Sequence, residues 1–178
     1  MELLDHIRLM ARYNQWMNSG VYEAAATLTA EQLKEDRGAF FGSLLGTLNH
    51  IMVGDIIWLK RFAQHPADLS ALSEIRQLPS PAALNTILHD DFKQLEQIRR
   101  SLDEIILNWV MQLTSEHLSD ELRYTNTRGE VSSRNLGLLV SHFFNHQTHH
   151  RGQATTLLSQ LGLDPGVTDL LMLIPEQH

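Results

Sequence analysis

The stretch SHFFNHQTHHRGQATTLL, from Ser141 to Leu158, decides the fold of this 178-residue chain. Its apolar side chains recur at the helical period of about 3.6 residues, which predicts an amphipathic helix. His146 and His150 are four residues apart, so their side chains project from one face of that helix. Two imidazoles placed in this way can share one metal ion. We expect the helix to begin after Ser132 or Ser133 and to end at Gly162.

Three further segments carry the same period. They run from about Leu3 to Leu28, from the cap residue Ser43 to about Phe62, and from Ser80-Pro81 to about Met111. Four long apolar-periodic segments predict an all-α four-helix bundle, and the length of the chain fits a single domain over residues 1–178.

The connections between these segments are informative. Residues 28–43 and 65–80 are long for a simple up-and-down bundle, so a crossed connectivity is expected. The stretch Arg123–Ser132 contains Thr, Tyr and Val around Arg128-Gly129, which favours a short hairpin-like excursion before the last helix.

Composition excludes several classes of function. The formal charge of −7 and the lack of a basic cluster argue against a nucleic-acid partner. No apolar run approaches the ~18 residues of a membrane span, and the N-terminus is acidic rather than basic, so a cytoplasmic protein without a membrane partner is expected. The absence of cysteine excludes disulfides, thiolate metal ligands and a thiol nucleophile.

His50 is the third candidate metal ligand. It lies on a segment that is apolar on nearly every side, with Gly46 one turn before it and Gly54 one turn after it. Each glycine costs about 1 kcal/mol relative to alanine inside a helix, so we expect the pair to make room for another helix or a ligand. The predicted site is therefore His50, His146 and His150. The alternative set His142, His146 and His149 also shares one helix face.

Polar residues interrupt two apolar stripes. Asn14 and Asp55 fall where buried side chains are expected, and a buried amide or carboxylate needs a partner. One interpretation is a structural hydrogen bond, to each other or to Arg151. The other is support of a site from behind its ligands, for which His149, Arg151 and Gln153 are further candidates.

Two known metal-site patterns are missing from the sequence. A di-iron carboxylate bundle needs two Glu-x-x-His motifs, and a zincin needs His-Glu-x-x-His. No residue stands out as a general base. Proximity on the helical wheel suggests only His149, Gln153 and Tyr13.

Four stretches together carry a resemblance to a known family. ARYNQWMN, LNHIMVGDIIWL, YTNTRGE and HFFNHQTHHRGQ resemble the DinB-like (DNA-damage-inducible) family of metal-dependent proteins over nearly the whole chain. The resemblance implies a crossed four-helix bundle, often a homodimer, whose metal triad corresponds to His50, His146 and His150. Characterised relatives are mycothiol-dependent maleylpyruvate isomerase and bacillithiol transferases. The isomerase branch has glutamate where this chain has His146, so the match to that branch is incomplete.

The expected function follows from three neutral ligands that leave one coordination position open. We expect one divalent transition-metal ion, zinc first and nickel in recombinant material, in a metal-dependent transferase or hydrolase that acts on a small molecule. The resemblance adds a low-molecular-weight thiol as a cofactor or ligand. The alternative is a non-catalytic, stress-related metal-binding protein.

Overall fold

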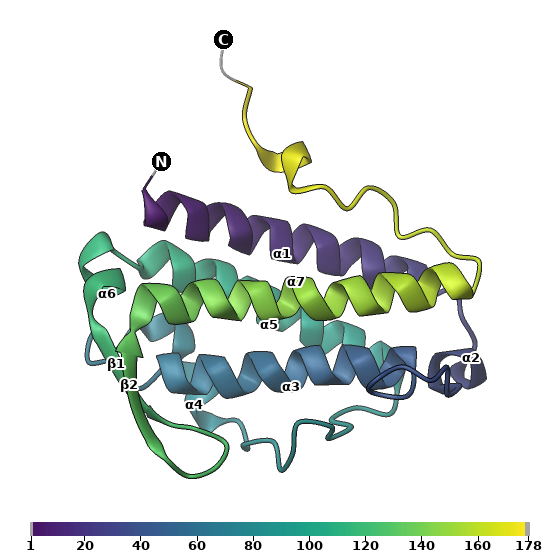
Figure 1. Cartoon of the computed structure of the whole chain (residues 1–178), viewed down its shortest axis with the longest axis horizontal. Helices are drawn as coiled ribbons and strands as arrows, with labels where there is room; N and C mark the ends of the chain where they lie inside the picture. Colours follow the sequence, from purple (N-terminus) through teal and green to yellow (C-terminus); the bar gives the residue numbers. More distant parts are fainter. Residues whose placement is uncertain (1, 177–178) are drawn as a thin grey trace.

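Four long helices run side by side in the computed structural model, which describes residues 2–176 (Figure 1). They are α1 (Leu3–Ala25), α3 (Leu44–Phe62), α5 (Phe92–Gln112) and α7 (Leu136–Gln160). α7 packs against both α1 and α3, and α5 packs mainly against α1. The predicted all-α four-helix bundle is confirmed.

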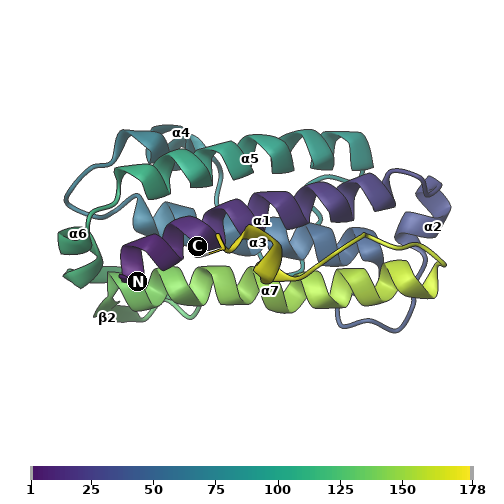
Figure 2. The ribbon, with the colours of Figure 1, turned by 90° about the horizontal axis from the view of Figure 1, so that it is seen from above.

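The helices are connected in crossed order. α1 and α7 run in one direction and α3 and α5 in the other, so the chain must return along the bundle between α3 and α5 (Figures 1 and 2). The crossover spans residues 63–91 and contains η1 (Ser70–Leu72) and α4 (Ser73–Gln77). A shorter connection holding α2 (Ala30–Lys34) joins α1 to α3. The long predicted loops therefore do provide a crossed connectivity.

A hairpin precedes α7, as predicted. After α6 (Ser115–Ser119), strands β1 (Glu121–Thr125) and β2 (Val131–Asn135) pair in antiparallel register from Glu121 opposite Asn135 to Thr125 opposite Val131. Gly129 in the turn has φ +81°, a conformation that glycine adopts without strain.

The predicted start of the third helix is wrong. α5 begins at Phe92 with Asp91 as its N-cap, not at Ser80-Pro81. The Asn49 side chain of α3 accepts hydrogen bonds from the backbone N–H groups of Leu88 and His89, at 2.8 and 3.0 Å. These tertiary bonds keep the segment irregular where the local signal favoured a helix.

Smaller boundary differences have equally local causes. Ser132 and Ser133 belong to β2, and the cap of α7 is Asn135, whose side chain accepts from the N–H of Leu138. The first helix ends at Ala25 rather than near Leu28. Gly162 follows the end of α7 with φ +77°, as expected of a helix-terminating glycine.

Aromatic residues fill the middle of the core. Phe62 stacks on Trp109 with ring centroids 4.8 Å apart, and Phe143 of α7 contacts both rings. Such ring pairs join α3, α5 and α7 and fix the positions of the helices that carry the histidines. None of the described helices combines the length and the apolar character needed to cross a bilayer.

Candidate metal site

α3 and α7 bring His50, His146 and His150 together. One ring nitrogen from each lies within 4.8 Å of the other two, and Nε2 of His50 is 3.2 Å from Nε2 of His150. The three rings lie along the seam between the two helices. Here His50 is buried and the other two are half-buried.

Hydrogen bonds orient the two closest rings. Nδ1 of His50 lies 2.7 Å from the carbonyl oxygen of Leu84, which can only accept, so Nδ1 carries the proton. Nδ1 of His150 lies 2.8 Å from Oε1 of Gln153 and is a donor by the same reasoning. The Nε2 atoms of both rings are thereby left with lone pairs, which is the tautomer that binds metals.

These contacts test whether the site fits a metal ion. Two lone-pair nitrogens facing each other at 3.2 Å repel unless a cation or a proton lies between them. Two ligands of one tetrahedral zinc at 2.0–2.1 Å would be about 3.3 Å apart. The spacing, the neutral donors and the fixed tautomers all fit one divalent transition-metal ion.

The histidines are held in their neutral form. Burial, together with the proximity of His150 and His50, lowers the pKa of His146 to about 3. Burial also lowers the pKa values of His50 and His150. Desolvation disfavours the imidazolium cation, so each ring keeps a lone pair for a metal at neutral pH.

The two glycines that flank His50 have different roles. A β-carbon on Gly54 would lie 2.6 Å from Cε1 of His146. Gly54 therefore makes room for another helix, as expected, and specifically for the His146 ring of α7. A β-carbon on Gly46 would overlap the backbone carbonyl of Phe41. The expectation that both glycines make room for another helix or a ligand is therefore wrong for Gly46, which instead admits the loop that carries Phe41. The Phe41 ring stacks on His50 with centroids 3.7 Å apart.

The alternative ligand set does not assemble. His142 and His149 are exposed. Among residues 2–176, the potential metal ligands that come close together are His50, His146 and His150, and neither His142 nor His149 joins them. His142 instead packs edge-on against Trp58, with centroids 5.1 Å apart. His149 contacts the edge of His150 at 4.8 Å between centroids.

Asp55 belongs to a buried polar network behind the site. It pairs with Arg99 of α5 and accepts a hydrogen bond of 2.6 Å from Nε2 of Gln147. Gln147 is the neighbour of His146, so the network begins one residue from the triad. Neither Arg99 nor Gln147 was among the residues singled out in the sequence. The only signal for them was that Asp55 needed a partner.

The other half of the network includes Asn14. Its side-chain oxygen accepts from Arg151, as one interpretation predicted, and its Nδ2 donates to Asp103 at 3.1 Å. Nη2 of Arg99 lies 2.9 Å from Asp103 and joins the two halves. Burial raises the pKa of Asp103 to about 6 and lowers that of Arg151 to about 10. The network links all four long helices.

The remaining predicted residues separate into two groups. Gln153 orients His150 directly, whereas Arg151 and Asn14 bond to each other away from the three histidines. Tyr13 donates from its hydroxyl to the carbonyl of Thr168 at 2.7 Å, so it is occupied by the C-terminal segment.

Comparison with known proteins identifies the family of this chain. A family model described as "DinB family" matches residues 3–177. The chain belongs to the DinB family. Protein DinB of Bacillus subtilis (strain 168) is 27% identical over 158 residues, which cover 88% of this chain and 87% of that protein. No solved structure gives a significant match. This DinB-family chain has three histidines that could hold a metal ion.

Proposed function

We propose that this protein is a metal-dependent enzyme that binds one divalent transition-metal ion through His50, His146 and His150 and catalyses transfer or hydrolysis on a small molecule. The observation that supports it most directly is the convergence of three imidazoles in which the Nε2 atoms of His50 and His150 lie 3.2 Å apart, each opposite an Nδ1 that contacts an oxygen acceptor. Zinc is the native metal we propose. Nickel also suits imidazole ligands.

Three protein ligands leave a coordination position open, which distinguishes catalytic from structural sites. Held by these neutral ligands, a divalent ion would keep its charge and would lower the pKa of a water or thiol toward neutrality, which would supply a nucleophile at physiological pH. The chain contributes orientation and partial exclusion of water. Leu84 and Gln153 fix the rings of His50 and His150, and Phe41 covers one face of His50.

A thiol cofactor is the finer part of the proposal. The chain has no cysteine, so a thiolate at the open position would come from a small molecule. The support for it is the resemblance to thiol-dependent enzymes, together with the preference of a cationic centre for an anionic ligand. Cobalt-substituted protein should develop sulfur-to-metal absorption when cysteine, glutathione or bacillithiol is added.

Metal analysis of untagged protein tests the ligand assignment. We expect about one ion per chain and sharply weaker binding when His50, His146 or His150 is replaced by alanine. His142→Ala and His149→Ala are matched controls on the same helix and should bind as the parent does. Equal loss in the controls would contradict the triad.

An activity screen tests the enzymatic part. Activated esters and electrophiles that accept a thiol should be turned over only with metal present. Metal binding without turnover or thiol response would favour a non-catalytic metal-binding protein instead.

A further inference from the structure

A hollow of about 500 Å³ lies beside α3, toward its C-terminal end. It is lined by four residues at the end of α3 and just after it, by residues 80–84 of the crossover, and by the hairpin at Thr125, the last residue of β1, and residues 126–127 of the turn; the first four are Ile57, Lys60, Arg61 and Gln64. We call it the Arg61 pocket. Its volume is in the range of sites for small organic ligands.

The charge of the Arg61 pocket is unusual for this protein. Its lining contains two cations and no carboxylate, although the chain as a whole carries a charge of −7. Glu130, near the turn, accepts a hydrogen bond from Asn126 and is not part of the lining.

Arg61 is positioned by ring stacking rather than by a counter-ion. Its guanidinium lies 4.6 Å from the Trp58 ring centroid and 4.9 Å from that of Tyr124. The ion pairs found within residues 2–176 do not include Arg61. Burial lowers the pKa of Arg61, which reflects the cost of a half-buried cation without a neutralising partner. Its donors remain available for a ligand.

The side chain of Lys60 contacts the part of the crossover that immediately precedes the pocket-lining residues 80–84. Its Nζ donates to the backbone carbonyls of Leu78 and Arg76. These bonds fix the ammonium at the carbonyl oxygens of residues 76 and 78 without neutralising its charge, and Lys60 also lines the pocket. An anion in the pocket would therefore meet a fixed ammonium and a planar guanidinium.

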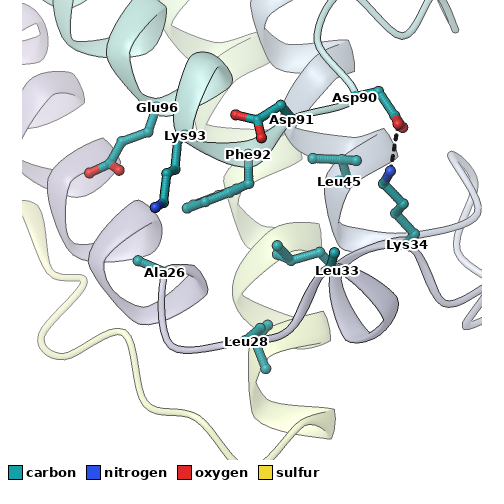
Figure 3. A pocket seen from close by; sticks show the side chains of 11 residues that line it. Ala26, Leu28, Leu33, Lys34, Leu45, Asp90, Asp91, Phe92, Lys93 and Glu96 are labelled. Atoms are coloured by element: carbon teal, nitrogen blue, oxygen red, sulfur yellow. Dashed lines mark hydrogen bonds and ion pairs between the residues drawn. The ribbon is translucent and has the colours of Figure 1, made fainter.

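A second hollow of similar size provides a contrast. It lies among the ends of α1 and α2 and the start of α5, and it has a volume of about 470 Å³ (Figure 3). Charged side chains of both signs surround it, and Lys34 is paired with Asp90 at 2.5 Å. Because its charges neutralise one another, nothing there selects an anion.

The Arg61 pocket is connected to the histidine triad. The carbonyl of Leu84 holds His50, and Leu84 also lines the pocket. A row of rings provides a second link: His146 lies 6.3 Å from His142, and His142 lies 5.1 Å from Trp58, on which Arg61 stacks. Arg61 follows Gly54, which lies beside His146, by seven positions, a rise of about 10 Å along the helix axis.

We propose that the Arg61 pocket binds the anionic end of a small organic ligand, a carboxylate or a phosphate, through Arg61 and Lys60. The body of the ligand packs against Ile57 and residues 81–83. That this ligand is the substrate or cosubstrate of the histidine site rests on the proposed function. The binding itself does not require a metal.

The test is binding of three probes to metal-free protein, measured by calorimetry and by amide shifts in NMR spectra. Benzoate and phenyl phosphate represent the two anion classes, and neutral benzamide is the uncharged control. We expect at least one anion to bind with shifts at residues 57–64 and 80–84, and benzamide to bind at least tenfold more weakly. Arg61→Met keeps the stacking chain and should weaken the anion about tenfold or more.

Matched variants separate charge from folding. Arg61→Lys should retain part of the affinity, and Lys93→Gln, which removes an exposed cation at the second hollow, should change nothing. Unchanged anion affinity in folded Arg61→Met, or binding of both benzoate and phenyl phosphate no tighter than that of benzamide, would overturn the proposal. His146→Ala, which leaves the bond between His50 and Leu84 in place, distinguishes it from the proposed function: it should lose metal but still bind the anion.

Discussion

Gly54 and His146 lie against each other across the seam between α3 and α7, and a β-carbon at position 54 would come within 2.6 Å of the imidazole. The space needed by one predicted ligand is therefore created by a missing side chain on the neighbouring helix. His146 cannot keep its position if residue 54 has a side chain, because the contact would be with the ring itself.

Gly54→Ala should consequently weaken metal binding by about tenfold or more while the helices still form, since alanine favours a helix. Gly152→Ala is the matched control, because nothing lies within 4 Å of a β-carbon there. Competition with a chromophoric chelator measures the affinity, and circular dichroism reports the fold. Parent-like affinity in Gly54→Ala would show that His146 does not need its present position.

Gln153 sets the orientation of His150. Gln153→Leu removes the acceptor for Nδ1, so we expect metal affinity to fall about 10- to 100-fold, as for other residues that hold a metal-ligating histidine. Gln153→Glu keeps an acceptor and should bind metal at least as well as the parent. The same chelator competition measures both, and equal affinities in all three proteins would argue against this role.

Arg99 and Arg100 are neighbours in sequence with opposite environments. Arg99 is 2% exposed and pairs with Asp55 and Asp103, whereas Arg100 reaches Glu96 on the surface. Arg99→Met leaves two buried carboxylates without a cation, and we expect it to lower the free energy of unfolding by about 3–5 kcal/mol. Arg100→Met should leave it nearly unchanged. Urea denaturation measures the free energy of unfolding of both variants. Equal values for Arg99→Met and Arg100→Met would contradict the prediction that the buried arginine stabilises the fold and the exposed one does not.

Asp103 should give stability a distinctive pH dependence. Its pKa is raised by burial to about 6 in the folded protein, against about 3.9 in an unfolded chain. The folded state therefore binds the extra proton between about pH 4 and pH 6, so stability falls as pH rises through this range and is then constant.

Asp103→Asn removes this contribution. Between pH 4 and pH 6, the free energy of unfolding of the parent should fall by up to about 3 kcal/mol relative to that of the variant. Chemical denaturation at a series of pH values measures the difference. If the difference grows in favour of the parent as pH rises, attraction to Arg99 outweighs desolvation and the pKa of Asp103 lies below its ordinary value.

Local patterns in the sequence predicted most of the fold. Apolar periodicity and the cap at Ser43 located the long helices because both depend on neighbouring residues. The helix start predicted at Ser80-Pro81 was wrong because the structure of this segment depends on a distant residue. The signal for a helix start is local, but Asn49, some forty residues earlier, bonds to the backbone of Leu88 and His89 and holds the segment in an irregular path of turns and bends.

The candidate site was accessible from the sequence only in part. His146 and His150 are related by one helical turn, and Gly54 marked His50 as unusual. The polar network could not be derived, because it joins Asp55 of α3 to Arg99 of α5 and Gln147 of α7, and the sequence does not specify the mutual rotation of these helices. The Arg61 pocket depends likewise on where the crossover returns.

The hydrogen bond from His50 to the carbonyl of Leu84 couples the crossover to the occupancy of the site. A metal ion bound at Nε2 of His50 requires the proton to be on Nδ1, and this proton is the one donated to Leu84. Metal binding therefore stabilises the conformation in which Leu84 contacts His50, and this contact raises the metal affinity by the same factor. The adjacent N–H groups of Leu88 and His89, bonded to Asn49, would report this linkage as slower hydrogen exchange in the metal-loaded protein. The local stability of the longest connection in the described chain, the crossover at residues 63–91, would thus depend on metal binding through the proton that His50 donates to Leu84.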